Sequence, residues 1–234
     1  DYRGAVETYD RALTVNPRLA EALAGLAWAL PMAGADDRMP DLVRRWQEVD
    51  PDDPVARHLA ASLGQRPPPS RCEGQYIEAF FDGFASTYDD TLEELTYRAP
   101  KQIAAMLQEI AGAPSAQFDI LDAGCGTGLC GTQVHGFARG LVGIDLSTEM
   151  LARARDRGIY DELVHADLVR GMEERADAAD VVVSADVLVY FGDLLAPFEA
   201  ARTALRPGGW LLASVEQGEV PDGFSLEETG RYQH

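Results

Sequence analysis

The sequence predicts an α/β protein in which a doubly wound parallel sheet follows a small all-α domain. Three observations lead to this prediction. Apolar residues recur at helical spacing over the first sixty-odd positions, three consecutive prolines follow, and short apolar runs then alternate with helical stretches around a glycine-rich loop. With 234 residues, 46% apolar and 25% charged, the chain is long enough to bury a proper core.

The first segment, residues 1–64, has the spacing of a helical repeat. Ala5, Tyr9, Ala12 and Pro17 follow one another as small, aromatic, small and proline, and Pro51 comes thirty-four residues after Pro17. Further apolar positions form the stripes of two helices: Leu23, Leu26, Leu30, Val43 and Trp46. This pattern resembles the tetratricopeptide (TPR) repeat, whose helix pairs stack to bury their apolar faces. A helical hairpin without a repeat is the alternative interpretation.

Two details qualify that resemblance. Met39 stands where the repeat family prefers alanine, and the pattern begins in mid-repeat at Asp1, so we expect the natural protein to extend further. Residues 54–63 predict one more helix, which would cap the stack. Residues 65–70 contain Pro67, Pro68 and Pro69, which lack amide donors, and predict a semi-rigid linker before a second domain at 71–234.

The second domain begins with a helical, aromatic-rich stretch from Arg71 to about Ala111, and its period then changes. Short apolar or β-branched runs predict five strands at residues 118–121, 141–144, 163–165, 181–184 and 210–214. The stretches 150–157 and 194–205 are the clearest helices between them. Strands that alternate with helices favour a parallel, doubly wound sheet.

A glycine-rich loop follows the first strand. Gly124, Gly126 and Gly128 let the backbone approach a ligand closely, but a dinucleotide fingerprint would need its third glycine at Leu129. Asp122 lies two residues before the first glycine, where its carboxylate would oppose a pyrophosphate and suit an ammonium group. The loop therefore predicts a ligand that is cationic at this end and carries no phosphate.

Acidic residues also end the next two strands. Asp145 ends the second, where a carboxylate can accept both ribose hydroxyls, and Asp167 ends the third, where it can accept from an adenine amino group. Because the carboxyl ends of parallel strands meet at one edge of a sheet, we expect these acids and Asp122 to face one crevice.

Together these motifs resemble the ordered motifs of class I S-adenosylmethionine-dependent methyltransferases. The resemblance covers residues 76–216 and includes residues 122–128, Asp145, Asp167, 180–193 and 205–210. More narrowly, residues 81–85, 88–89, 95 and 97–100 resemble bacterial methyltransferases that carry N-terminal TPR repeats. The resemblance implies a Rossmann-like methyltransferase sheet, the donor S-adenosylmethionine and the product S-adenosylhomocysteine.

The resemblance also implies roles for individual residues. The three glycines would surround the methionine part of the donor, and Asp122 would bind its ammonium directly or through water. Asp145 would hold the ribose, with Leu146 and Met150 against the adenine face and Asp167 and Leu168 at its edge. Ser184 and Ala185 would line the sulfonium side. Candidate lid residues are Tyr76, Tyr88 and Arg98, and Arg98 could clamp the donor carboxylate.

The same resemblance implies two further strands at the end of the sheet. The sequence beyond Glu219 is short, polar and rich in turn residues. We therefore expect the C-terminal strands, and part of the acceptor pocket, to be incomplete.

The acceptor is left open by the sequence. Asp186 and Tyr190, just after the fourth strand, are weak catalytic candidates, since a base is needed only if the acceptor must lose a proton. The formal charge of −19 disfavours nucleic acid and anionic lipid. We expect a small molecule with a carboxylate or hydroxyl group, while TPR-like repeats favour a protein partner, self-association or a protein acceptor. Alternatives are a scaffold that only senses the nucleoside, and transfer of an aminopropyl group.

Cysteine and histidine usage predicts no metal site. Cys72, Cys125 and Cys130 show no paired ligand spacing with the four histidines. Unpaired thiols fit a reducing, cytoplasmic setting. No apolar run is long enough to span a bilayer, so no membrane association is expected.

Overall fold

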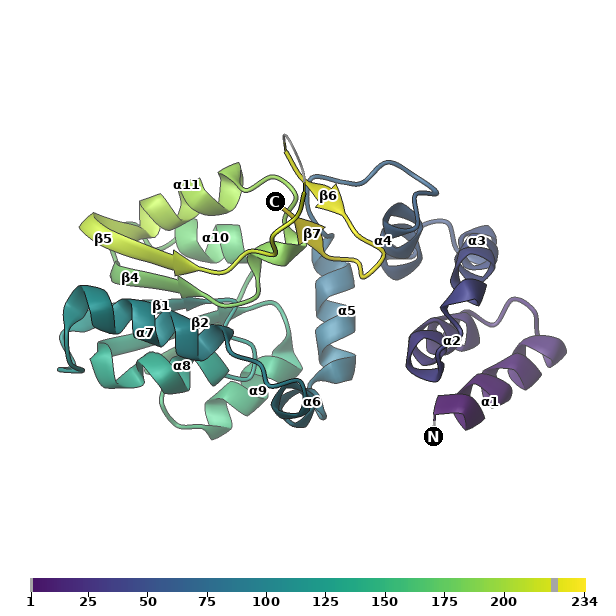
Figure 1. Cartoon of the computed structure of the whole chain (residues 1–234), viewed down its shortest axis with the longest axis horizontal. Coiled ribbons are helices and arrows are strands. Elements are labelled where there is room, and N and C mark those ends of the chain that lie inside the picture. Colours follow the sequence, from purple (N-terminus) through teal and green to yellow (C-terminus); the bar gives the residue numbers. More distant parts are fainter. Residues whose placement is uncertain (1, 220–222) are drawn as a thin grey trace. The chain divides into compact units, whose positions relative to one another are not determined.

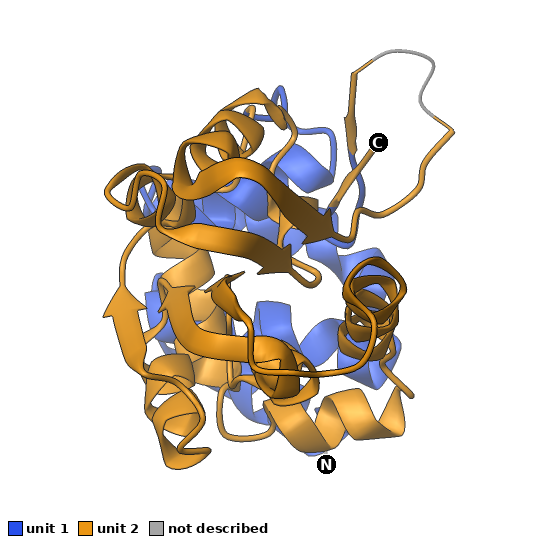
Figure 2. Cartoon of the chain, turned by 90° about the vertical axis from the view of Figure 1, so that its left-hand side faces the viewer, with its two compact units in different colours: residues 1–69, 226–231 blue, residues 70–225, 232–234 orange. Residues whose placement is uncertain are grey.

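The computed structural model describes residues 2–219 and 223–234 (Figure 1). The chain forms two compact units: residues 1–69 with 226–231, and residues 70–225 with 232–234 (Figure 2). Among the described residues, no helix is both long and apolar enough to cross a membrane.

The first unit consists of helices joined by short turns. They are α1 (Tyr2–Val15), α2 (Ala20–Ala33), the 3-10 turn η1 (Asp36–Arg38), α3 (Met39–Val49) and α4 (Pro54–Ser62). Helix α2 ends at Gly34, whose φ of 70° is a left-handed conformation that glycine adopts readily. Helix α4 begins at Asp53, whose side chain accepts hydrogen bonds from the amides of Val55 and Ala56.

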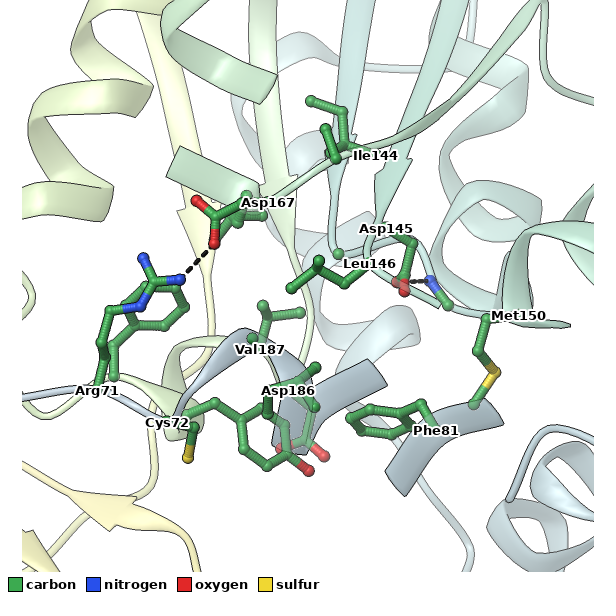
Figure 3. Close-up of a pocket in the computed structure, with 18 of the residues that line it drawn as sticks. Arg71, Cys72, Phe81, Ile144, Asp145, Leu146, Met150, Asp167, Asp186 and Val187 are labelled. Carbon is green, nitrogen blue, oxygen red and sulfur yellow. Dashed lines mark hydrogen bonds and ion pairs between the residues drawn. The ribbon is translucent and has the colours of Figure 1, made fainter. Parts of the chain in front are cut away.

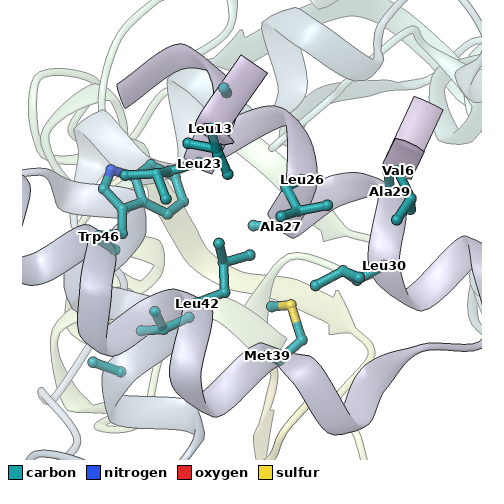
Figure 4. Packing of buried hydrophobic residues seen from close by; sticks show 14 residues of the cluster. Val6, Leu13, Leu23, Leu26, Ala27, Ala29, Leu30, Met39, Leu42 and Trp46 are labelled. Carbon is teal, nitrogen blue, oxygen red and sulfur yellow. The ribbon is translucent and has the colours of Figure 1, made fainter. Parts of the chain in front are cut away.

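The core of this unit contains the apolar stripes predicted from the sequence (Figure 4). Leu23, Leu30, Val43 and Trp46 are almost fully buried. Helices α1 and α2 pack closely because position 25 is a glycine: a Cβ there would lie 2.3 Å from Cζ of Tyr9. The helices are therefore present, and their assignment to the TPR family stays a prediction.

The second unit contains a five-stranded parallel sheet in the order β3-β2-β1-β4-β5. The strands are β1 (Phe118–Ala123), β2 (Ala138–Asp145), β3 (Glu162–His165), β4 (Ala179–Ser184) and β5 (Leu205–Ala213). The predicted α/β fold with a parallel sheet is thus confirmed. The order reverses between β1 and β4, which is where doubly wound sheets open a crevice at their carboxyl ends.

Helices pack against this sheet and bury its apolar side chains in two clusters. They are α7 (Ala99–Ala111), α8 (Leu129–Val134), α9 (Thr148–Asp156), α10 (Leu168–Glu173) and α11 (Leu195–Ala204), with 3-10 turns η2 (His135–Phe137) and η3 (Leu188–Tyr190). Two more helices, α5 (Gly74–Phe84) and α6 (Tyr88–Glu94), precede α7. The stretch predicted as helical from Arg71 therefore starts one turn later, at Gly74.

The C-terminal segment contributes no strand to the main sheet within the described residues. Strands β6 (Ser225–Leu226) and β7 (Tyr232–Gln233) form a separate two-stranded sheet. The expectation of incomplete C-terminal strands concerns this segment, of which residues 220–222 lie outside the described part.

Candidate functional site

The glycine loop leaves β1 and enters α8 through left-handed backbone conformations. Gly124 and Gly126 have φ values of 80° and 53°. The amides of Gly124 and Cys125 both donate to the carbonyl of Ile144, which fixes the loop over the end of β2. A Cβ at Gly124 would lie 2.4 Å from Cγ2 of Val187, so a side chain there would collide with the opposite wall. The loop therefore requires glycine for both conformation and space.

Asp145, at the end of β2, is held by backbone amides. Its Oδ2 accepts from Gly126 at 2.8 Å and its Oδ1 accepts from Ser147 at 2.9 Å. Burial raises the pKa of this carboxyl, while these amides work in the opposite direction. Each oxygen has a second lone pair, so the carboxylate can still accept two further hydrogen bonds.

Asp167 is the N-cap residue of α10 and pairs with a residue from far along the chain. Its Oδ1 accepts from the amides of Val169 and Arg170, and its Oδ2 accepts from the guanidinium of Arg71. The Arg71 guanidinium also lies over the ring of Phe191, 5.2 Å from its centroid. Asp167 thus enters the site as a member of an ion pair, which the sequence did not predict.

Asp122 is completely buried beneath the glycine loop and does not line the cavity described below. Its Oδ2 accepts a hydrogen bond from the hydroxyl of Tyr160 at 2.7 Å, and its Oδ1 has no hydrogen-bond partner. Burial raises the pKa of Asp122 to about 7, against the opposing effect of the Tyr160 hydrogen bond. Tyr160 fits here because position 131 is a glycine, where a Cβ would lie 2.2 Å from its hydroxyl oxygen.

Helices α5 and α6 are hydrogen-bonded to the loops that follow β1 and β2. Asp82 of α5 accepts from the hydroxyl of Ser147 at 2.5 Å, and Asp89 of α6 accepts from the hydroxyl of Thr127 at 2.5 Å. The same carboxylate of Asp89 pairs with Arg157. These contacts join both helices to the loops, and Phe81 of α5 and Tyr88 of α6 line the cavity described below.

The ring of Phe81 contacts one ring from α6 and one from η3. The ring of Phe81 meets Tyr190 edge-on at a centroid distance of 5.6 Å and Tyr88 at 6.1 Å. Burial raises the pKa of Tyr88, so its hydroxyl stays neutral. Asp186 follows β4 with a φ of 60°, and its amide donates to Oγ of Ser214 at 2.8 Å.

These elements line an open cavity at the carboxyl ends of the strands (Figure 3). Of the residues predicted from the sequence, those that line it are Gly124, Gly126, Asp145, Leu146, Met150, Asp167, Leu168, Ala185, Tyr88, Asp186 and Tyr190. The motif order and the geometry of parallel strands therefore bring most of the candidates together.

Five other candidates do not line the cavity: Asp122, Gly128, Ser184, Tyr76 and Arg98. Ser184 is buried, and its hydroxyl donates to the carbonyl of Ala123, joining β4 to β1. Tyr76 is buried and stacks near Phe80, while Arg98 is exposed at the start of α7. Neither Tyr76 nor Arg98 lines the cavity, and their roles as lid residues stay predictions.

Sequence reasoning missed the contribution of the segment 70–72. The amide of Cys72 donates to the carbonyl of Tyr190, and Ser70 accepts from the amides of Gly192 and Asp193. This short antiparallel contact carries Arg71 and Cys72 into the cavity wall. The signal in the sequence is only positional, since the segment directly follows the three prolines and cannot begin a helix there.

No group of three or more His, Cys, Asp or Glu side chains within residues 2–219 and 223–234 is arranged to hold a metal ion. The cavity is instead lined by three carboxylates, one guanidinium, glycines and apolar or aromatic side chains. Such a lining suits an organic ligand that has an apolar ring, hydroxyl groups and positive charge.

A family model described as a methyltransferase domain matches residues 120–209. Methyltransferase-like protein 27 of Homo sapiens is 38% identical over 87 residues, which cover 36% of this chain and 35% of that protein. Malonyl-[acyl-carrier protein] O-methyltransferase of Yersinia pestis is 27% identical over 177 residues, covering 76% of this chain and 61% of that protein. A solved DhpI-SAM-HEP complex aligns with a TM-score of 0.49 and 27% identity, over 64% of this chain and 68% of that one. The chain thus spans less than two thirds of the length of either curated relative.

Proposed function

We propose that this chain transfers a methyl group to an oxygen of a small molecule. The premise is that residues 120–209 form a class I methyltransferase domain whose donor is S-adenosylmethionine. S-adenosylhomocysteine is the second product. The observation that carries the proposal is Asp145, which is held by two amides at the end of β2 and faces the cavity with lone pairs to spare.

The residues of the cavity fit the donor. Asp145 would accept hydrogen bonds from both ribose hydroxyls, while Leu146 and Met150 would pack against one face of the adenine. Gly124 and Gly126 have no side chains and would leave room for the methionine part beside the loop backbone. Asp167 and Leu168 would lie at the adenine edge, with the Asp167 carboxylate shared between Arg71 and the adenine amino group.

Asp122 would act through its charge rather than by contact. Its unpartnered Oδ1 is buried below the loop that would surround the donor's cationic end. In a region shielded from water, a carboxylate attracts a nearby ammonium or sulfonium group without touching it. The role inferred from the sequence, direct or water-mediated binding, thus becomes electrostatic support from beneath the loop.

The donor supplies a methyl group that is activated by its positively charged sulfur. The chain's own contribution is to align the acceptor oxygen with that methyl group and to exclude water. Ala185 would border the sulfonium side, and the rings of Phe81, Tyr88 and Tyr190 would offer faces that attract a cation.

An oxygen acceptor is supported by the name of the Yersinia relative, an O-methyltransferase. The net charge of −19 argues against a nucleic acid acceptor, so a small molecule with a hydroxyl or carboxylate group remains the proposal. The three cysteines are free thiols, which supports a cytoplasmic location.

For residues 1–64 we propose a TPR-like domain that docks a partner or a second copy. Every residue that lines the cavity lies between Arg71 and Phe191, so removal of residues 1–69 should leave donor affinity within about threefold. Some stability should be lost, because residues 226–231 belong to the same unit and Gly230 accepts a hydrogen bond from buried His58. A truncated protein that folds but cannot bind S-adenosylhomocysteine would show that residues 1–69 form part of the donor site.

The experiment for the proposed function combines calorimetry with product analysis. We expect S-adenosylhomocysteine to bind with micromolar affinity, and methyl-labelled S-adenosylmethionine to transfer its label to an oxygen of an added small molecule. Binding without transfer to any acceptor would favour the alternative of a nucleoside sensor. Transfer of the aminopropyl group would identify a different reaction of the same donor.

A further inference from the structure

The cavity has an unbalanced set of charges. Its lining contains the carboxylates of Asp145, Asp167 and Asp186, and Arg71 supplies the one positive side chain among the described lining residues. That guanidinium is already engaged, because it pairs with Asp167 and lies over the ring of Phe191. An incoming anion would therefore have to break this pair to reach a positive side chain.

The wall beside Asp186 is aromatic. Phe81 from α5 contacts Tyr88 from α6 and Tyr190 from η3, and the last two rings carry hydroxyl groups. Figure 3 shows Phe81 and Asp186 on the same side of the cavity, away from Asp167. Aromatic faces in this arrangement accept a flat ring by stacking or edge contact.

Asp186 has an unusual backbone conformation for a residue with a side chain. Its φ of 60° places it in the left-handed region, and Ser214 holds its amide there. Backbone strain of this kind persists where the surrounding structure requires it, and it is concentrated at functional sites. Asp186 is the second residue after β4 and borders the cavity.

We propose that the acceptor is an uncharged aromatic hydroxyl compound, and that Asp186 removes its proton. The proposal rests on the function proposed above. The hydroxyl proton goes to the Asp186 carboxylate, and the acceptor oxygen forms a bond to the methyl carbon. The bond between that carbon and sulfur breaks, its electron pair remains on sulfur as a neutral thioether, and Asp186 releases the proton to water.

The charge of the cavity selects against a free carboxylate acceptor. A carboxylate needs no deprotonation, so a base beside it would be superfluous, and its negative charge would face Asp186 with the guanidinium of Arg71 already paired. A phenolic hydroxyl is neutral on entry and becomes negative only as the proton leaves, next to the positive sulfur. The same cavity thus favours one of the two acceptor classes that the sequence left open.

The test uses catechol and benzoate, which are similar in size and shape but differ in charge at neutral pH. Affinities are measured by titration into the full chain saturated with S-adenosylhomocysteine, and transfer is measured with labelled S-adenosylmethionine. We expect catechol to bind at least about tenfold more tightly than benzoate. If S-adenosylhomocysteine itself fails to bind, the proposed function fails; if it binds and benzoate is preferred or catechol does not bind, only this inference is overturned.

The variant that tests Asp186 is Asp186→Asn, since asparagine tolerates a left-handed conformation well. It should lower the rate of transfer to catechol by about 10²- to 10⁴-fold, the usual contribution of a general base. It should also raise benzoate affinity about fivefold, because a negative charge is removed, and leave S-adenosylhomocysteine affinity within twofold. A gain for benzoate is an effect that a merely structural role of Asp186 would not produce.

Asp177→Asn is the matched control. Asp177 is exposed, has a φ of 51° and does not line the cavity, so the substitution makes the same chemical change in the same backbone conformation. It should alter neither affinity nor the transfer rate. An Asp186→Asn variant that transfers to catechol as fast as the Asp177→Asn control would overturn the role of Asp186 as the base.

Discussion

The parallel sheet carries aspartates at both ends of its strands, and their surroundings differ: Asp119 of β1 and Asp180 of β4 lie at the amino-terminal edge, Asp122 of β1 and Asp145 of β2 at the carboxyl edge. At the amino-terminal edge, Asp119 accepts two hydrogen bonds from Arg139, and Arg206 reaches both Asp119 and Asp180 at 2.9 and 2.8 Å. The hydrogen bonds from Arg139 lower the pKa of Asp119. Burial works to raise the pKa of Asp180, but the Asp119 amide and Arg206 outweigh it and lower that pKa. At this edge, therefore, both aspartates are paired with arginine side chains.

At the carboxyl edge the aspartates meet amides and hydroxyls. Asp145 is bonded to two backbone amides and Asp122 to one tyrosine hydroxyl, and burial raises the pKa of both. A carboxylate in such surroundings costs folding free energy, unlike one paired with arginine. We therefore expect the amino-terminal aspartates to stabilise the sheet, and we propose that the carboxyl-terminal ones serve a ligand that brings hydroxyl groups and positive charge.

The strongest test of this comparison is the Asp145→Ala substitution. It should weaken S-adenosylhomocysteine binding about ten- to hundredfold, because charge-assisted hydrogen bonds to the ribose are lost. Isothermal titration of the folded variant measures this, with Asp119→Ala from the opposite edge as the control. Equal affinities for Asp145→Ala and the unsubstituted chain would remove Asp145 from the site.

The second prediction concerns the pH dependence of stability. The pKa of Asp122 is about 7 in the folded chain and 3.8 ordinarily, so the folded state holds a proton that the unfolded state releases between these values. Asp122 therefore lowers the free energy of unfolding as pH rises from about 4 to 7, and the raised pKa of Asp145 acts in the same direction.

Asp122→Asn should consequently raise the free energy of unfolding at pH 8 by about 1–3 kcal/mol and change it little at pH 4. Urea denaturation at the two pH values provides the measurement. Tyr160→Phe, which removes the hydrogen bond but keeps the ring, should act in the opposite direction at pH 8. A gain for Asp122→Asn that is the same at both pH values would show that ionisation of Asp122 is not its cause.

The smallest effect is expected at the amino-terminal edge. Asp180→Asn should lower the free energy of unfolding at pH 7 by at most about 1 kcal/mol, since its partners are partly exposed and screened by solvent. Because the folded pKa of Asp180 is lowered, its contribution exists above pH 3.8 and disappears as pH falls through the folded value. The loss should shrink in 1 M salt. A change in donor affinity in this variant would contradict the claim that the amino-terminal aspartates act on stability alone.

The positions of Asp145 and Gly124 followed from the sequence because both rest on strong rules. A glycine-rich turn after a strand admits few side chains, and the carboxyl ends of parallel strands converge at one edge. The position of the Asp122 side chain was harder to predict, because Asp122 precedes the loop and the pleat of β1 decides to which side its side chain points. The structure turns it beneath the loop toward Tyr160, a contact between residues 38 positions apart that no local pattern encodes.

The place of Arg71 in the cavity wall could not be predicted from the sequence for a different reason. It lies in a segment without periodicity, and an antiparallel contact with Phe191 carries it into the cavity wall. Such a pairing depends on where the prolines direct the chain, which sequence spacing does not specify. Arg98 failed to line the cavity for a related reason, because α7 begins there and directs the side chain to solvent.

The central claim is that the carboxyl edge binds a cationic nucleoside without phosphates. The most direct measurement is a thermal-shift comparison of S-adenosylmethionine, NAD and FAD at equal concentration. We expect the buried Asp122 carboxylate to repel a phosphate at the loop, and Leu129 stands where a dinucleotide loop would have its third glycine. Stabilisation by S-adenosylmethionine alone is the predicted result, whereas stabilisation by NAD with none by S-adenosylmethionine would contradict the account.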